Sequence, residues 1–114
     1  MPVVKNIMLK VYAMESGKRE LVECDAVAPG AWINLENPSD REIEKITTET
    51  GIPEDMIKAA LDEEERAHID TDGDCTLIVI DIPVINEEKD DYVYSTLPLA
   101  IINTDDYFVT VCLR

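Results

Sequence analysis

Alternating apolar and polar positions along the chain predict a protein built mainly from strands. In the first stretch, Ile7, Leu9 and Val11 share one face and mostly polar side chains share the other, as in a half-buried strand. A glycine-containing turn and a short apolar stretch follow, so the first two strands are expected to form a hairpin. The predicted strands span residues 3–12, 21–24, 32–35, 66–70, 75–85, 92–103 and 107–113.

Two helices are predicted between the third and fourth strands. Ser39 and Glu42 have the spacing of a capping box, in which each side chain accepts a hydrogen bond from the other residue's amide. Gly51 is expected to end the first helix, because glycine readily adopts the left-handed conformation found there. Pro53 suits the first turn of the second helix. The helix residues expected to face inward are Ile43, Ile46, Thr50, Met56, Ile57, Ala60 and Leu61.

The two longest strands carry more specific expectations. The run from Cys75 to Ile85 is nearly continuously apolar, which predicts a strand covered on both faces near the centre of the sheet. Pro98 cannot donate a ladder hydrogen bond, so the next strand is expected to be bent or partly at an edge. Turns are predicted at residues 15–18, 70–74, 86–91 and 103–106. This order of elements predicts an α+β fold, with a mixed sheet of about seven strands and helices packed on it.

The composition fits one aliphatic domain. The chain has 114 residues, of which 46% are hydrophobic, enough for a single domain with its own core. Its longest apolar run is interrupted by Asp81 and Pro83, so no segment is expected to span a bilayer. The N-terminus lacks the pattern of a secretory signal. Cys24, Cys75 and Cys112 lack C-x-x-C spacing and are expected to be buried thiols in a reducing cytosol.

The net charge limits the kinds of molecule that this chain is expected to bind. Twenty-five carboxylates against ten Lys and Arg residues give a net charge of −15. Such a surface repels phosphate backbones and anionic lipids, so nucleic-acid binding and direct membrane contact are disfavoured. Cations are the natural partners. The plain alternative is that the acidic surface only keeps a small protein soluble.

Two acidic stretches are candidates for a metal site. Asp62 and Glu63 begin the run Asp-Glu-Glu-Glu after the second helix, where carboxylates oppose the negative end of the helix dipole and a cation would relieve the cost. An exposed charged loop is the alternative for this run. Asp70, Asp72 and Asp74 have the spacing of a calcium loop, but the glycine needed at the sixth position is absent. A hairpin turn explains that stretch better.

The sequence carries no sign of catalysis. His68 is the only histidine, and no nucleophile or metal motif accompanies it, so a histidine on a strand surface is expected. A phosphate-binding glycine loop is also missing from the sequence. We therefore expect that the chain is not an enzyme. A small metal-dependent hydrolase built on the acidic cluster is the enzyme alternative.

A combination of motifs marks a resemblance to a known family. The motifs are Trp-Ile-Asn-Leu at 32–35, Asn-Pro-Ser at 37–39, Gly-Ile-Pro at 51–53, Leu-Asp-x-Glu-Glu-Arg at 61–66, and the paired strands at 97–111. Together they resemble the N-terminal cytoplasmic domain of CorA-type magnesium transporters. The resemblance covers roughly residues 31–112.

The resemblance implies a function for the whole chain. Residues 1–114 would form a single cytoplasmic regulatory domain on the inner face of the cell membrane, and the membrane-spanning region would be absent from this chain. The full protein would be a homo-oligomer, a pentamer, that transports Mg²⁺ and also Co²⁺ or Ni²⁺. A regulatory Mg²⁺ between acidic subunits would gate it. The alternative is a free-standing acidic cytosolic interaction module without a transport role.

The resemblance also locates a regulatory metal site. Family members place a carboxylate pair in the second helix, and alignment from Gly51 puts Lys58 and Ala59 at those positions. Because that pair is missing, Asp62 and Glu63 are the remaining metal candidates, and the affinity for Mg²⁺ is expected to be weak, about millimolar. Without the rest of the protein, the domain is expected to be a monomer or a weak oligomer.

Overall fold

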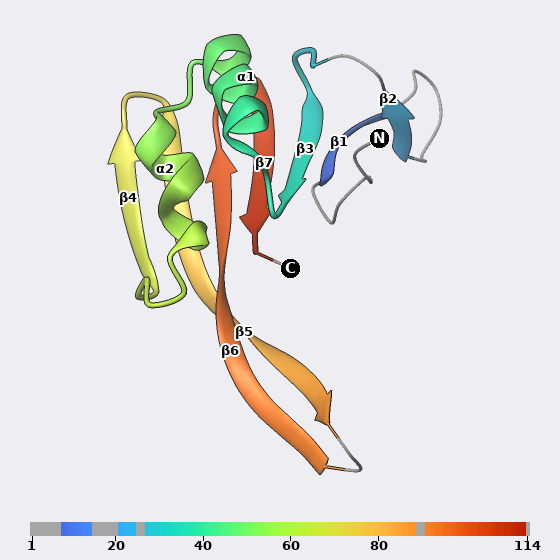
Figure 1. The fold of residues 1–114 in the computed structure, drawn as a ribbon. Coiled ribbons are helices and arrows are strands. Elements are labelled where there is room, and N and C mark those ends of the chain that lie inside the picture. Colours follow the sequence, from blue (N-terminus) through green and yellow to red (C-terminus); the bar gives the residue numbers. More distant parts are fainter. Residues whose placement is uncertain (1–7, 15–20, 25–26, 89–90, 114) are drawn as a thin grey trace.

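The computed structural model describes residues 8–14, 21–24, 27–88 and 91–113, which fold into one mixed sheet with helices on one face (Figure 1). The seven strands lie in the order β2-β1-β3-β7-β6-β5-β4. The predicted α+β fold is confirmed. The strands are β1 Met8–Met14, β2 Leu21–Cys24, β3 Ala31–Glu36, β4 His68–Asp72, β5 Cys75–Glu88, β6 Asp91–Asn103 and β7 Tyr107–Cys112. The helices are α1 Asp40–Thr50, α2 Glu54–Lys58 and the 3₁₀ turn η1 Ala59–Leu61.

Strands β3 and β7 form the parallel pair at the middle of the sheet. Ile33 lies opposite Val109 and Leu35 opposite Val111, and the other neighbouring strands pair antiparallel. The predicted hairpin is present as β1 and β2. Residues 3–7 of the first predicted strand and the turn predicted at 15–18 lie outside the described residues. Among the described residues, no helix has the length and apolar character needed to cross a membrane.

Helix α1 begins and ends where the sequence predicts. The amide of Glu42 donates to Ser39 Oγ at 3.2 Å, and the amide of Ser39 donates to Glu42 Oε1 at 2.9 Å, which completes the capping box. Gly51 ends the helix with φ of +77°, a conformation that costs glycine little. The Thr50 hydroxyl donates to the carbonyl of Ile46 and accepts from the amide of Ile52, so it is satisfied at the edge of the core.

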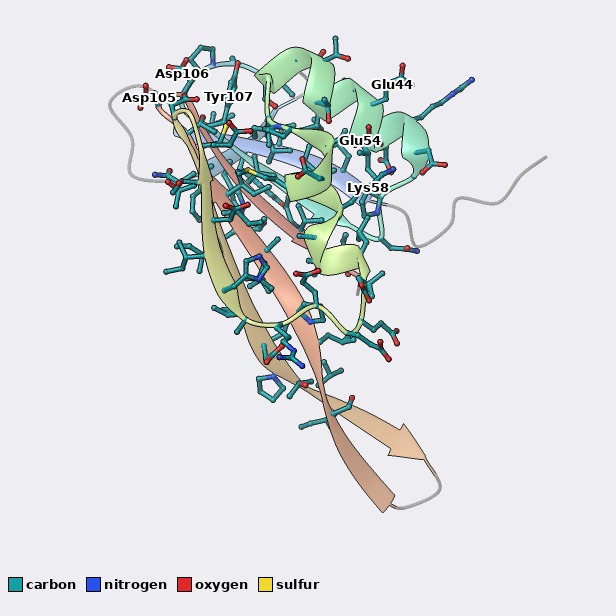
Figure 2. All side chains as sticks on the ribbon, turned by 90° about the vertical axis from the view of Figure 1, so that its left-hand side faces the viewer. Glu44, Glu54, Lys58, Asp105, Asp106 and Tyr107 are labelled. Atoms are coloured by element: carbon teal, nitrogen blue, oxygen red, sulfur yellow. The ribbon has the colours of Figure 1, made fainter. Side chains whose placement is uncertain are left out.

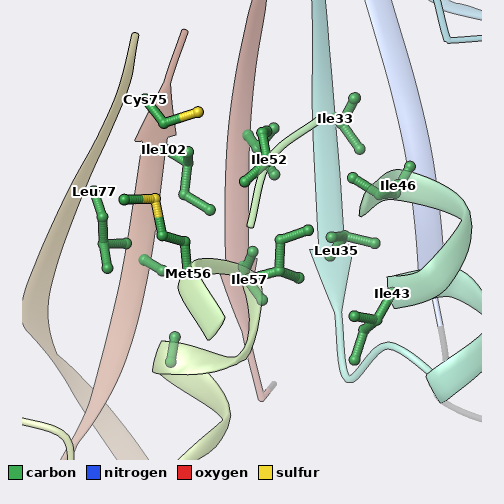
Figure 3. Packing of buried hydrophobic residues seen from close by; sticks show 14 of the residues in the cluster. Ile33, Leu35, Ile43, Ile46, Ile52, Met56, Ile57, Cys75, Leu77 and Ile102 are labelled. Atoms are coloured by element: carbon green, nitrogen blue, oxygen red, sulfur yellow. The ribbon is translucent and has the colours of Figure 1, made fainter. Parts of the chain in front are cut away.

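The core lies between the helices and one face of the sheet. Ile33 and Leu35 of β3 are buried beside Ile43 and Ile46 of α1 (Figure 3). Met56 of α2 is buried beside Leu77 of β5 and Ile102 of β6, whereas the buried Ile57 points toward Leu35 (Figure 3). The predicted inward face of the helices is confirmed, except that Thr50 and Leu61 are half-buried. The other buried hydrophobic residues of the cluster are Val11, Ala31, Ile52, Ala60, Cys75, Leu77, Val79, Ala100, Ile102, Val109 and Val111.

The prediction that β5 is central and covered on both faces is wrong. Cys75, Leu77 and Val79 are buried, but Ile78 is half-buried and Ile80 is 38% exposed. Strand β5 lies second from the edge of the sheet, and the helices pack on one face only. The continuous apolar run of β5 therefore gives this strand one buried face and one apolar face at the surface.

Pro98 of β6 lies just beyond the end of the neighbouring strand β7. Pro98 is opposite Asp81 of β5, whereas the pairing of β6 with β7 begins at Leu99, opposite Cys112. The missing amide hydrogen of Pro98 therefore removes no bond to β7, and the expectation that this strand is partly at an edge is confirmed. Beyond this point β5 and β6 continue as a two-stranded arm that projects from the sheet (Figure 1).

Two predicted turns are shorter than expected. Strand β4 continues to Asp72, which pairs with Cys75, so the turn contains only Gly73 and Asp74. Asp70 and Asp72 lie within a strand rather than in a loop, because ladder pairing to β5 satisfies their backbone groups. The turn predicted at 86–91 is likewise reduced, because β5 extends to Glu88 and β6 begins at Asp91, with 89–90 outside the described residues.

Loss of the capping box should destabilise the domain measurably. We expect Ser39→Ala to lower the free energy of unfolding by about 1 kcal/mol, because an amide of the first helical turn loses its acceptor. Urea denaturation measures the change. Thr48→Ala removes an exposed hydroxyl from the same helix and should change the stability by less than about 0.5 kcal/mol. Equal effects of the two variants would contradict the role of Ser39.

The thiol of Cys75 should make the stability depend on alkaline pH. Burial raises the pKa of this thiol above its ordinary value of 9.0, and the neighbouring Asp74 carboxylate, 3.7 Å away, raises it further. The unfolded chain therefore ionises first, so stability present below pH 9 is lost as the pH rises through the native pKa. The free energy of unfolding, measured between pH 8 and 10.5, should fall less steeply with rising pH for Cys75→Ala than for the unsubstituted chain. Cys112→Ala is the control for removal of a thiol, and an unchanged slope in Cys75→Ala would be the contrary result.

Candidate functional site

The acidic run predicted as a metal site forms a surface turn between η1 and β4. Asp62 follows the last residue of η1, and its Oδ1 accepts a hydrogen bond from the amide of Glu64 at 2.9 Å. The carbonyl of Asp62 also accepts from the amide of Glu65 at 3.0 Å. Asp62 and Glu63 are both exposed. Asp62 therefore already uses one carboxylate oxygen to hold the turn in shape.

The neighbours of this turn do not gather around a common point. Glu65 lies 3.5 Å from His68 Nδ1, and the same nitrogen lies 2.6 Å from the carbonyl of Arg66. His68 is exposed at the start of β4, as predicted. In residues 8–14, 21–24, 27–88 and 91–113, no three His, Cys, Asp or Glu side chains are placed to hold a metal ion together. Asp62 and Glu63 alone would offer Mg²⁺ few direct ligands, so a site there would depend on water or on a second subunit.

A groove between α1 and α2 brings a second set of charged side chains together. Its volume is about 440 Å³, and Figure 2 shows Glu44, Glu54 and Lys58 on its two helices. The lining residues are Asp40, Glu44, Thr47, Thr48, Glu54 and Lys58. Three carboxylates and one ammonium group thus share one open depression on the helical surface.

Lys58 supplies the positive charge in this groove. Its Nζ lies 2.6 Å from Glu54 Oε1, one helical turn earlier in α2. The hydrogen bond to Glu54 raises the pKa of Lys58, and the charges of Glu54 and Asp40 raise it further. Because both partners are about half exposed, solvent and salt screen the pair. The pair matters for the charge of the groove more than for the stability of the fold.

One polar atom beside the groove is unsatisfied. Thr47 Oγ1 is buried and has no hydrogen-bond partner among the described residues. Thr47 follows the buried Ile46 on α1, so its hydroxyl lies at the border between the core and the groove. Such an atom carries a desolvation cost and is an unused oxygen at the edge of the groove.

The groove could not be located from the sequence alone. Asp40 and Glu44 are four residues apart, as are Glu54 and Lys58, and this spacing places each pair on one helical face. The spacing does not show that the two faces meet. That depends on how α1 and α2 pack, which is decided by Ile46, Met56 and Ile57 below them.

The loops at the far end of the sheet have a structural role. The amide of Gly30 donates to the carbonyl of Asp106 at 2.6 Å, and the Thr104 hydroxyl accepts from the amide of Tyr107 at 2.9 Å. Asp105 and Asp106 are exposed around a shallow depression of about 190 Å³ (Figure 2). These bonds join the β6–β7 turn to the start of β3, which positions the central pair of strands.

Removing the ammonium group should strengthen cation binding in the groove. We expect Lys58→Met to raise the affinity for Mg²⁺ roughly three- to tenfold, because Glu54 is no longer neutralised and the divalent ion is no longer repelled. Amide chemical shifts of Asp40 and Glu54 during a Mg²⁺ titration measure the effect.

Lys45→Met is the matched control for this experiment. Lys45 is exposed on α1 but does not line the groove, so its removal changes the net charge equally without changing the local balance. If both variants bind Mg²⁺ with the same affinity, only the overall charge matters, and the proposed role of Lys58 is wrong.

Comparison with solved structures identifies the fold. The soluble domain of CorA from Methanocaldococcus jannaschii superposes with a TM-score of 0.76 at 20% identity, over 98% of this chain and 43% of that chain. The complete CorA magnesium transporter from the same organism gives 0.70 at 22% identity, over 100% and 34%. The ZntB cytoplasmic domain from Vibrio parahaemolyticus RIMD 2210633 gives 0.61 at 14% identity, over 95% and 44%. The chain therefore spans less than half of the length of these structures.

Comparison of the sequence with families extends this result. A search of curated proteins found no match. Residues 29–114, which include the capped helix, both acidic regions and the central parallel strands, match the family described as CorA-like Mg²⁺ transporter protein. The match covers most of the chain and the same motifs that suggested the resemblance. The chain belongs to the CorA-like Mg²⁺ transporter family and has the fold of the N-terminal part of the CorA soluble domain.

Proposed function

We propose that this chain is the N-terminal regulatory domain of a CorA-like transporter, on the cytoplasmic face of the membrane. The observation that carries the proposal is the family match over residues 29–114, supported by the fold shared with the CorA soluble domain. In this proposal residues 1–114 form one domain and perform no chemistry. Transport of Mg²⁺, and of Co²⁺ or Ni²⁺, takes place in another part of the full protein.

The proposed regulation is electrostatic. Copies of a domain with net charge −15 repel one another when they are held side by side in a homo-oligomer, which we propose is a pentamer. Mg²⁺ between neighbouring carboxylates offsets the repulsion and favours a closely packed, closed state. When the ion is lost, the open state becomes more populated, because the ion bound the closed state more tightly.

Weak binding suits such a sensor. Mg²⁺ dehydrates reluctantly and usually keeps several waters, so exposed carboxylates such as those of Asp62 and Glu63 would contact it partly through water. Lys58 occupies a position where the family resemblance implies a carboxylate, and it adds a competing positive charge. Both features favour a dissociation constant of about a millimolar. Changes in intracellular free Mg²⁺ near that concentration would change the occupancy of the site.

The native reading frame tests the assignment directly. If the proposal is correct, the gene encodes two apolar segments of about 20 residues after this domain, with Gly-Met-Asn between them. The encoded protein should carry Mg²⁺ into proteoliposomes. A stop codon directly after Arg114 would contradict the proposal and favour a free-standing interaction module.

A Mg²⁺ titration tests the proposed sensor residues. In the full-length oligomer, Asp62→Asn combined with Glu63→Gln should raise the Mg²⁺ concentration needed for thermal stabilisation roughly threefold or more, because two charges leave the subunit contact. Glu49→Gln combined with Asp55→Asn removes the same charge from exposed helical positions and is the control. A micromolar site, or equal shifts in the two double variants, would contradict the assignment of Asp62 and Glu63.

A further inference from the structure

Among the described residues, no third strand pairs with the β5–β6 arm, which consists of residues 82–88 and 91–97. The pairing of β4 with β5 ends at Val79, and the pairing of β7 with β6 ends at Leu99. Pro83 offers no amide hydrogen to a strand added at the β5 edge. A two-stranded hairpin is only marginally stable in water by itself, so the arm is expected to gain stability from a partner that packs against it.

The far end of the arm carries a pair of like charges. Glu88, the last residue of β5, lies directly opposite Asp91, the first residue of β6, and Glu87 precedes it on the same strand. Like charges directly opposite each other in an antiparallel ladder destabilise the pairing of the strands. A partner with positive charge would offset this repulsion, so the arm is expected to bind a basic surface.

The outward face of α1 carries a like-charged pair of the opposite sign. Arg41 and Lys45 are four residues apart, so they lie on one face of the helix, and both are exposed. They lie away from the sheet, because Ile43 and Ile46 occupy the inward face. Neither basic side chain has an ion-pair or hydrogen-bond partner among the described residues. Two like charges at this spacing disfavour the helix, and an acidic partner would offset the cost.

The arm points away from α1 of its own chain. Figures 1 and 2 show α1 at one end of the molecule and the arm projecting from the opposite end. From Asp81 to Glu88 the strand β5 rises about 23 Å. The acidic end of the arm therefore lies far from the cations of its own α1 and is placed to contact a neighbouring molecule.

We propose that the arm of one copy packs against α1 of the next copy in the oligomer, with Glu87, Glu88 and Asp91 near Arg41 and Lys45. This inference rests on the proposed function, which makes the chain a subunit of a homo-oligomer. A contact between two different surfaces of identical subunits closes into a ring when the rotation between neighbours allows it. The contact joins neighbours of net charge −15 without a metal ion, so it is separate from the Mg²⁺ contact proposed above.

Disulfide cross-linking in the full-length protein tests the contact. Lys45→Cys and Glu88→Cys, introduced together, should form a disulfide between chains under a mild oxidant, seen as products of two or more chain masses. Thr71→Cys with Glu88→Cys is the matched control, because Thr71 is exposed on β4, outside the proposed contact. We expect the first pair to cross-link about tenfold faster than the control pair, because a disulfide forms only between residues that come close together. The single variants give the background from the native thiols.

A charge reversal tests whether α1 recognises the arm by its charge. Arg41→Glu alone, or Glu88→Lys alone, should raise the fraction of dissociated subunits about threefold, because each brings like charges together. The two substitutions combined should return the fraction close to that of the unsubstituted oligomer, measured by native mass spectrometry. Arg66→Glu with Glu88→Lys has the same net charge but changes an exposed residue outside α1, so it should not restore the oligomer. Equal recovery in both combinations would contradict the proposal.

The outcomes separate this inference from the proposed function. An oligomer that transports Mg²⁺ but cross-links Lys45→Cys no faster than the control would overturn the inference alone. A disulfide formed within one chain would show that the arm reaches its own α1, and it would also overturn the inference. A full-length protein that is monomeric, or a reading frame that ends at Arg114, would overturn both proposals.

Discussion

The parallel pairing of β3 with β7 is the constraint on which the rest of the structure depends. Ile33 lies opposite Val109 and Leu35 opposite Val111, all four fully buried, although 70 residues separate the two strands. Parallel neighbours need a crossover connection, and here that connection contains α1, α2 and the three strands β4–β6. The helices in this connection lie over one face of the sheet, and the main hydrophobic cluster forms between them and that face. The loops around Gly30 and Thr104 hold the two strand starts together.

The core excludes charge, so the acidic character of the chain is a property of its surface. Among the described residues, the buried core contains no charged or polar residue, whereas the net charge of the whole chain is −15. The carboxylates therefore act on partners and on each other through solvent, over distances limited to about 8 Å at physiological salt. In the α1–α2 groove, Lys58 offsets part of this charge by pairing with Glu54, beside Asp40 and Glu44.

The two faces of the sheet differ for a physical reason. One face carries the helices and holds the buried core, whereas the other has a polar network around Trp32 and apolar side chains along β5. Antiparallel pairs predominate in this sheet, and antiparallel sheets can leave one face open to water. This domain accounts for 43% of the CorA soluble-domain structure on which it superposes.

The sequence by itself determined the local secondary structure, because capping residues, glycines and apolar spacing act over only a few neighbouring residues. The capping box of Ser39 and Glu42, the end of α1 at Gly51, and the inward face of Ile43 and Ile46 follow from spacing and backbone preference, and all were predicted correctly. The family was also readable from the motifs. Strand order, the open face of β5 and the meeting of α1 with α2 were decided by tertiary structure. An apolar run shows only that a strand can be buried, whereas which of its faces is covered depends on elements distant in the sequence.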